Sequence, residues 1–229
     1  MNLAIIIPAA GRGTRFGSPL PKQYHVLGGL PILARTLATA LRVPHVIAVV
    51  VAVASDDAQF EDMLQGAGLA DTRLHRVDGG EERQFSIRNA LAHPAVADAD
   101  IVLVHDAVRP LASVALYERV SAATLTHDAV VPVTRISDTV KRVDEGGFVV
   151  KTLPRADLRS VQTPQGFKAD LLRKAYEQAD AEGWTGTDDA SLVEAAGGRV
   201  STIEGETWNM KVTTGSDVSI AELLLHEAE

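Results

Sequence analysis

The chain has 229 residues, of which 46% are hydrophobic, 23% are charged and only 4% are aromatic. These proportions are typical of a globular protein, and the length fits one domain with an aliphatic core. The absence of cysteine excludes disulfides, thiolate metal sites and cysteine nucleophiles. The longest apolar run, Val46 to Ala54, is too short to span a membrane, and no basic residue precedes the apolar start. We therefore expect a cytoplasmic protein that binds no membrane.

The charge distribution is uneven along the chain. The net charge is −8, yet the first 55 residues contain no Asp or Glu and carry +5, so the remainder carries −13. A general nucleic-acid-binding protein is normally basic, and we expect no nucleic-acid partner here. The acid-free N-terminal quarter favours the binding of a smaller anion.

Short apolar runs alternate with helical patterns over the first 133 residues. Buried strands are expected at 3–7, 46–54, 73–77, 101–104 and 129–133. Helices are expected after Pro31, over 57–65 and 85–92, and from Ser113 to about 126. Because continuous apolar strands separated by helices are buried on both faces, the pattern predicts a mostly parallel α/β sheet with helices on both sides.

The alternation of apolar strands and helices is interrupted between 134 and 160. Two alternating segments, 138–143 and 148–153, flank the turn sequence 144–147, which predicts a β-hairpin. An isolated hairpin is marginally stable in water, so we expect this arm to contact another surface, and a partner subunit is the obvious candidate. Helices at 168–182, 188–196 and 215–228 and a strand at 199–203 follow. We therefore expect one domain, 1–229, with 134–160 as a dimerisation arm.

A glycine-containing loop, Pro8 to Gly17, follows the first strand. It differs from a dinucleotide-binding loop, because Phe16 takes the place of the third glycine, the sequence after Gly17 forbids a helix and no ribose-binding acid follows. It also lacks the Gly-Lys-Ser/Thr of a P-loop. What remains is an open loop with backbone N–H groups and three cations, Arg12, Arg15 and Lys22. This inventory fits a nucleoside triphosphate.

Asp106 is the second candidate feature. It follows the expected strand 101–104, and ligands of open α/β sheets bind at the carboxyl ends of such strands. The carboxylate fits a Mg²⁺ ligand or an acceptor for substrate hydroxyls, and the alternatives are a helix cap or a partner of Arg109. The neighbouring His105 is expected to be a packed strand-end residue. Lys211 is expected inside an apolar strand, between Met210 and Val212.

Several segments, in order along the whole chain, resemble the sugar-phosphate nucleotidyltransferases. The resemblance is closest to the cytidylyltransferases that act on 2-C-methyl-D-erythritol 4-phosphate (MEP) in the non-mevalonate isoprenoid pathway. The matching segments are Pro8-Ala9-Ala10-Gly11-x-Gly13-x-Arg15, Pro21-Lys22-Gln23, Gly79-Gly80-x-x-Arg83-x-x-Ser86, His105-Asp106-Ala107-Val108-Arg109-Pro110, Asp138-Thr139-x-Lys141, Arg155-x(6)-Gln162-Thr163-Pro164-Gln165-x-Phe167, Thr187-Asp188-Asp189-Ala190-Ser191 and Asn209-Met210-Lys211-Val212-Thr213. The resemblance implies a Rossmann-like sheet of the nucleotidyltransferase type and a homodimer that exchanges its arms.

The resemblance also implies a reaction and a set of site residues. CTP and MEP would give 4-diphosphocytidyl-2-C-methyl-D-erythritol and pyrophosphate, with Arg15 and Lys22 as the catalytic pair and Mg²⁺ on Asp106. The implied CTP-binding residues are Ala9, Ala10, Gly11, Gly13, Gly80, Glu81, Ser86, Asp106 and Lys211. The implied residues for the polyol phosphate are Asp106, Arg109, Thr139, Arg155, Thr163, Thr187 and Lys211.

The chemistry supports this inventory independently. The nucleophile is a phosphate monoester, whose second pKa near 6 leaves it largely ionised at pH 7, so no general base is needed. Two polyanions must instead be aligned and their charge stabilised, which calls for Lys, Arg and a divalent cation.

Three other functions remain open from the sequence. A ribitol 5-phosphate cytidylyltransferase has nearly the same motifs, and the region 134–165 would distinguish it. A dinucleotide-dependent oxidoreductase is disfavoured by the missing helix after Gly17, and a non-catalytic nucleotide sensor by the presence of both Arg15 and Lys22.

Overall fold

The computed structural model describes residues 1–11 and 16–228. Its centre is a mixed β-sheet with the strand order β10-β7-β11-β6-β1-β4-β5, and β12 pairs with β7. The strands are β1 (Leu3–Pro8), β4 (Val46–Val53), β5 (Leu74–Asp78), β6 (Ile101–Val104), β7 (Ala129–Arg135), β10 (Arg159–Val161), β11 (Gln165–Lys168) and β12 (Ser201–Glu204). Strands β6, β1, β4 and β5 run parallel to one another, which confirms the parallel unit predicted for the first half of the chain.

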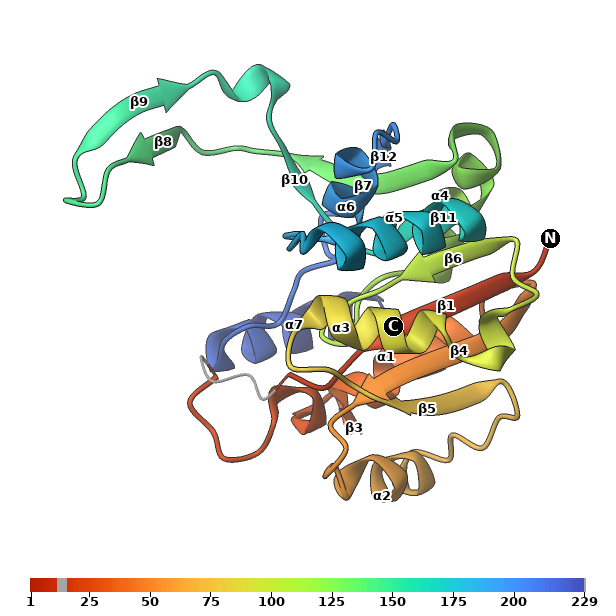
Figure 1. Ribbon diagram of the computed structural model, residues 1–229. Coiled ribbons are helices and arrows are strands. Elements are labelled where there is room, and N and C mark those ends of the chain that lie inside the picture. Colours follow the sequence, from red (N-terminus) through yellow and green to blue (C-terminus); the bar gives the residue numbers. More distant parts are fainter. Residues whose placement is uncertain (12–15, 229) are drawn as a thin grey trace.

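Helices cover both faces of this sheet (Figure 1). They are α1 (Ile32–Leu41), α2 (Gln59–Gly66), α3 (Arg83–Leu91), α4 (Val114–His127), α5 (Ala169–Glu182), α6 (Asp189–Ala195) and α7 (Gly215–Ala228). Each lies where the sequence predicts a helix, within a few residues at the ends. Ser113 caps α4 as expected, because its hydroxyl accepts a hydrogen bond from the Leu116 N–H at 3.0 Å.

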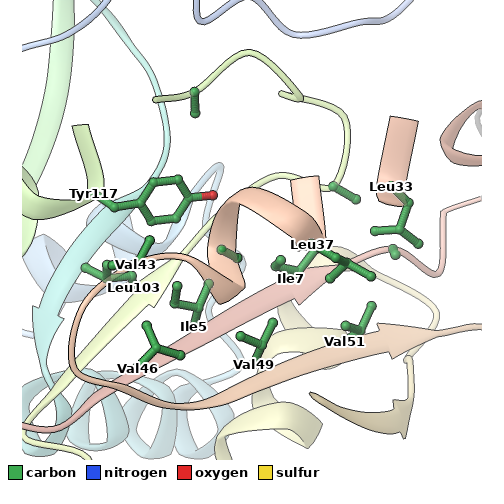
Figure 2. Close-up of a cluster of buried hydrophobic side chains, with 14 of the residues drawn as sticks. Ile5, Ile7, Leu33, Leu37, Val43, Val46, Val49, Val51, Leu103 and Tyr117 are labelled. Atoms are coloured by element: carbon green, nitrogen blue, oxygen red, sulfur yellow. The ribbon is translucent and has the colours of Figure 1, made fainter. Parts of the chain in front are cut away.

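The continuous apolar strands fill two separate core layers. On one face Ile5, Ile7 and Leu103 pack with residues of α1, α2 and α4, and Figure 2 shows Leu33, Leu37 and Tyr117 above the strands. On the other face Ile6 and Val104 pack with α3, α5 and α6. Because successive strand residues point to opposite faces, β1, β4 and β6 must be apolar at every position.

The antiparallel strands β10 and β11 are a difference from the prediction. They pair with successive parts of β7, and β11 also pairs antiparallel with β6. Strand β11 therefore separates the parallel pair β7–β12 from the parallel strands β6, β1, β4 and β5. The segment Gln165–Lys168 has only one large apolar residue, so no periodic pattern marks it. Gly166 explains how it fits: a Cβ there would meet Thr124 Oγ1 of α4 at 2.4 Å, so the helix packs directly on this backbone.

The predicted hairpin is present and projects from the body of the protein (Figure 1). Strands β8 (Val140–Val143) and β9 (Val149–Leu153) pair with each other in a sheet of their own. Phe148 is 75% exposed, and Val149 and Val150 are also exposed. The arm therefore carries apolar side chains that its own chain does not cover.

Short elements connect the larger helices and strands. The 3-10 helix η2 (Lys22–Tyr24) and the two-residue strands β2 (Val26–Leu27) and β3 (Leu30–Pro31) connect the glycine loop to α1, while η3 (Pro94–Val96) and η4 (Arg155–Asp157) are single turns. Helix α7 packs on β2 through Ala221, which lies in one apolar cluster with Leu27 and Val212. Within the described residues, no helix is long and apolar enough to cross a membrane.

Candidate active site

A cleft of about 180 Å³ opens where the parallel strands end. The loops that follow β1, β5 and β6 form its walls, because the carboxyl ends of parallel strands meet at one edge of a sheet. Its lining residues are Pro8, Ala9, Ala10, Gly11, Lys22, Gln23, Gly80, Glu81, Glu82, Arg83, Ser86, Asp106, Ala107, Val108 and Lys211.

The first wall is the start of the glycine loop. Ala9 is buried, and its carbonyl accepts a hydrogen bond from Gln23 Nε2 at 2.8 Å. The same segment, η2, carries Lys22, so the hydrogen bond fixes this lysine's backbone beside the loop. Gln23 received no role from the sequence, although it lies in the motif Pro21-Lys22-Gln23.

The second wall is the loop 79–82 between β5 and α3. Gly79 must be glycine, because a Cβ there would lie 2.3 Å from the Ala10 Cβ, at the point where the two loops touch. The Gly80 N–H donates to Ser86 Oγ at 3.1 Å, and Ser86 Oγ donates to the Glu82 carbonyl at 3.1 Å. Ser86 is buried, so it shapes this loop from within.

Asp106 lies at the floor of the cleft among three cations. Its Oδ2 is 2.9 Å from Lys211 Nζ and 3.6 Å from Arg109 Nε, and its Oδ1 is 3.4 Å from Arg83 Nε. Burial opposes ionisation of this carboxyl, but Arg83, Lys211 and Arg109 together hold its pKa well below the usual range. Asp106 is therefore a carboxylate at neutral pH, held by ion pairs from three sides.

A buried polar layer supports Asp106 from behind. Thr163 Oγ1 accepts a hydrogen bond from the Asp106 N–H at 3.0 Å and contacts His105 Nδ1 at 3.0 Å. The Asn209 side chain donates to the Thr163 carbonyl at 2.8 Å, and the Asn209 backbone carbonyl accepts from Arg109 Nη1 at 2.7 Å. The loop that carries Lys211 is thus tied to the end of β6.

His105 belongs to this supporting layer, as expected. Its ring is fully buried and lies 5.0 Å from the ring of Tyr117 between centroids. Burial lowers the pKa of His105 to about 4, so the imidazole is neutral at pH 7.

The cleft brings together most of the residues predicted to bind CTP. Ala9, Ala10, Gly11, Gly80, Glu81, Ser86, Asp106 and Lys211 line it, and so does Lys22, which was predicted to be catalytic. Gly13 and Arg15 lie outside the described residues. Lys211 is not in a strand as predicted but in a loop, where the Met210 N–H donates to the Trp208 carbonyl and the Val212 N–H to the Val108 carbonyl.

The residues predicted to bind the polyol phosphate are more scattered. Arg109 and Thr163 lie behind Asp106, with Arg109 only 12% exposed. Thr187 is exposed just before α6 and does not line the cleft. Thr139 and Arg155 are exposed on the arm, where Arg155 donates a hydrogen bond to the Ser137 carbonyl.

Arg83 is the main residue that sequence reasoning missed. It is the first residue of α3 and bridges Asp106 to Asp189, which lies 2.8 Å from its Nη2. It stands in the motif Gly79-Gly80-x-x-Arg83, and its position at the start of a helix beside the cleft was the available signal. Its link to Asp189, 106 residues away, has no local signature.

The fold and the cleft define an α/β nucleotidyltransferase: a Rossmann-like sheet with cations and small loop residues gathered at its carboxyl edge. The sequence profile of the 2-C-methyl-D-erythritol 4-phosphate cytidylyltransferase family matches residues 3–227. The chain therefore belongs to this family.

Individual relatives are similar to this chain over most or all of their lengths. The chain is 39% identical to the 2-C-methyl-D-erythritol 4-phosphate cytidylyltransferase of Acidobacterium capsulatum, covering 99% of this chain and 98% of the relative. It is 45% identical to the enzyme of the same name from Frankia casuarinae, covering 98% and 81%. The crystal structure of the Thermus thermophilus enzyme superimposes with a TM-score of 0.81 at 34% identity, covering 99% of this chain and 100% of that one.

The chain is accordingly an enzyme, and its activity is cytidylyl transfer to MEP in the non-mevalonate isoprenoid pathway. The relatives described above are all named as MEP cytidylyltransferases. These comparisons therefore favour this activity over the ribitol 5-phosphate and oxidoreductase alternatives.

The low pKa of His105 predicts a specific pH dependence of stability. The unfolded histidine binds a proton as the pH falls through about 6.5, whereas the folded one does so only near 4. The contribution of His105 is therefore complete above pH 6.5 and is lost as the pH falls toward 4. Between pH 7 and pH 5 it amounts to about 2 kcal/mol.

Urea unfolding at pH 7 and pH 5 measures this loss. His105→Gln retains a donor toward the Arg109 carbonyl but cannot titrate, so its free energy of unfolding should fall by about 2 kcal/mol less than that of the wild type. Equal losses in the two proteins would contradict the assignment.

Proposed function

We propose that cytidylyl transfer takes place in the cleft at the carboxyl edge of the sheet, with Arg15 and Lys22 as the catalytic cations. The observation that carries this proposal is the position of Lys22 and Lys211 in one cleft with Asp106 and the small residues of two glycine loops. This arrangement suits a triphosphate, because lysines supply compact charge and small residues allow a close approach of the backbone.

The reaction requires that the protein align the two phosphate substrates and stabilise their negative charge. The attacking phosphate oxygen of MEP is already ionised, so the cleft requires no general base. Lys22, together with Arg15, would stabilise the charge that develops around the α-phosphorus as pyrophosphate leaves. The neutral His105 faces away from this chemistry into the polar layer behind Asp106.

The loop 79–82, together with Ser86 of α3 and the backbone of Ala9 and Ala10, would bind cytosine. Cytosine carries an exocyclic amine, which a loop carbonyl accepts, whereas uracil presents an oxygen there and would leave that carbonyl unpaired. Glu81 is exposed at the rim of this loop, and Ser86 holds its shape.

Mg²⁺ is the proposed cofactor, with Asp106 as its protein ligand. The described residues contain no group of three or more His, Asp or Glu side chains that could hold a metal alone. This fits Mg²⁺, which commonly takes one or two carboxylates and completes its shell with substrate phosphates and water. When bound, the ion would neutralise phosphate charge. Asp106 is ionised for this role.

The arm, 134–160, would complete the site of a second subunit in a homodimer. Its exposed apolar residues, Phe148, Val149 and Val150, support an interface. Arg155 and Thr139 support a shared site, because both lie on the arm and outside the cleft of their own chain. Arg109, Thr163, Thr187 and Lys211 would bind the polyol phosphate with them. The cytoplasmic location remains a prediction.

A pyrophosphate-release assay tests the activity and the role of Lys22 together. CTP with MEP should be the best pair when CTP, UTP and ATP are crossed with MEP and ribitol 5-phosphate. Lys22→Ala should lower kcat about 10²–10³-fold with the fold intact, since one transition-state donor is removed. Lys174→Ala, an exposed lysine on α5, is the control and should retain activity. Near-normal turnover by Lys22→Ala would refute its assignment.

Removal of divalent cations should abolish activity. Two phosphate groups must meet beside Asp106, and a hard cation lowers their repulsion. Dialysis against chelator followed by titration with MgCl₂ should restore the rate of pyrophosphate release. Full activity after exhaustive metal removal would exclude the proposed cofactor.

The shared site predicts complementation between two inactive variants. Lys22→Ala and Arg155→Ala homodimers should each be nearly inactive. In a mixed dimer one site would collect both lesions and the other neither, so random mixing should return roughly a quarter of the wild-type activity.

Refolding the two variants together and assaying pyrophosphate release distinguishes the cases. Each variant refolded alone is the baseline, and Arg142→Ala, an exposed residue of the same arm, should be active by itself. If mixed dimers form and no activity returns, Arg155 acts within its own chain and the shared site is wrong.

A further inference from the structure

A chain of buried polar contacts leads into the cleft from the helical layer outside it. Tyr176 of α5 donates from its hydroxyl to Asp189 Oδ1 at 2.6 Å, and Asp189 Oδ2 lies 2.8 Å from Arg83 Nη2. Arg83 Nε in turn lies 3.4 Å from Asp106 Oδ1. The contacts thus connect the helical layer with the carboxylate on the cleft floor.

Asp189 can occupy its position only because both of its oxygens are paired. Its side chain is completely buried, where an unpaired carboxylate would be very unfavourable. Arg83 neutralises one oxygen and Tyr176 donates to the other. Burial and then the nearby Asp189 raise the pKa of Tyr176 far above its usual range, so the hydroxyl keeps its proton. Tyr176 and Arg83 therefore both act as hydrogen-bond donors to the Asp189 carboxylate.

Arg83 differs from the lysines of the cleft. Its guanidinium lies between two carboxylates, Asp106 and Asp189, whose charges together exceed its own. Lys211, by comparison, is 40% exposed, and its ion pair is with Asp106. Arg83 is therefore poorly suited to bind another anion and well suited to hold Asp106 in place.

We propose that Tyr176 and Asp189 are positioning residues of the cytidylyl transfer, acting through Arg83 to fix the orientation of the Asp106 carboxylate. Arg83 holds Oδ1, so Oδ2 points toward Lys211 and Arg109. The guanidinium is required for its shape as well as its charge, because two of its nitrogens reach two different carboxylates at once. The proposal rests on the assignment of Asp106 to the site.

Loss of the Tyr176 hydroxyl should therefore affect turnover more than nucleotide binding. Tyr176→Phe should lower kcat about tenfold, because Asp189 loses a hydrogen bond to a charged group and Arg83 is held less firmly. KM for CTP should stay within about twofold, since the loops at Ala9 and Gly80 are untouched. The rate is expressed per CTP-binding site, counted by calorimetric titration with CTP, so that a smaller folded fraction cannot imitate the effect.

Tyr117→Phe is the matched control. Tyr117 is also a fully buried tyrosine, but its hydroxyl has no hydrogen-bond partner among the described residues. Its removal should leave kcat unchanged. A similar fall in both variants would show a general effect of core packing and would overturn the proposal, as would a kcat of Tyr176→Phe within twofold of the wild type.

Arg83→Lys provides a second test that does not depend on how Tyr176→Phe folds. Lysine keeps the charge but cannot reach both carboxylates, so kcat per CTP-binding site should again fall at least about tenfold. Wild-type turnover in this variant would mean that charge alone suffices and would refute the bridge. Failure of the proposed activity itself is distinct, because the wild type would then release no pyrophosphate from CTP and MEP.

Discussion

The arrangement of this cleft depends on one ionised carboxylate held by three cations. Asp106 stands at the end of β6, and Arg83, Lys211 and Arg109 approach it from α3, from the loop after β12 and from its own loop. Burial alone would favour its neutral form, and the three cations reverse that preference. Because these residues come from separate parts of the chain, the ion-pair cluster forms only when the sheet, α3 and the C-terminal region are all in place.

Tight backbone packing gives the cleft its walls. Gly79 allows the loops after β1 and β5 to lie against each other, and Gly166 allows α4 to lie against β11. The first contact places the small residues Ala9, Ala10, Gly11 and Gly80 along one cleft, where a ligand can approach the backbone closely. The second brings Thr163, just before the same strand, beneath Asp106. Glycine thus acts here through the space it leaves rather than through any chemistry of its own.

The arm differs from the body of the protein in how it treats its apolar side chains. The body buries apolar strands on both faces, while the hairpin β8–β9 leaves Phe148 and its neighbours exposed. A hairpin of this size gains little from its own side chains and depends on a second surface. Arg155 and Thr139, which the proposed shared site assigns to a second subunit, lie on this arm and do not line the cleft of their own chain.

The sequence by itself determined the parallel unit, the helices and the hairpin, and it singled out Asp106, Lys22 and the glycine loops as candidates, because each leaves a local pattern of hydrophobicity, turns or motif spacing. The tertiary structure decided the antiparallel insertion of β11, the loop position of Lys211 and the bridge from Asp189 through Arg83 to Asp106. Those features depend on which segments meet in space. A buried carboxylate is stable only where oppositely charged groups lie close to it in space. Arg83 and Asp189 are 106 positions apart in the chain, so no periodic pattern in the sequence reveals that they meet.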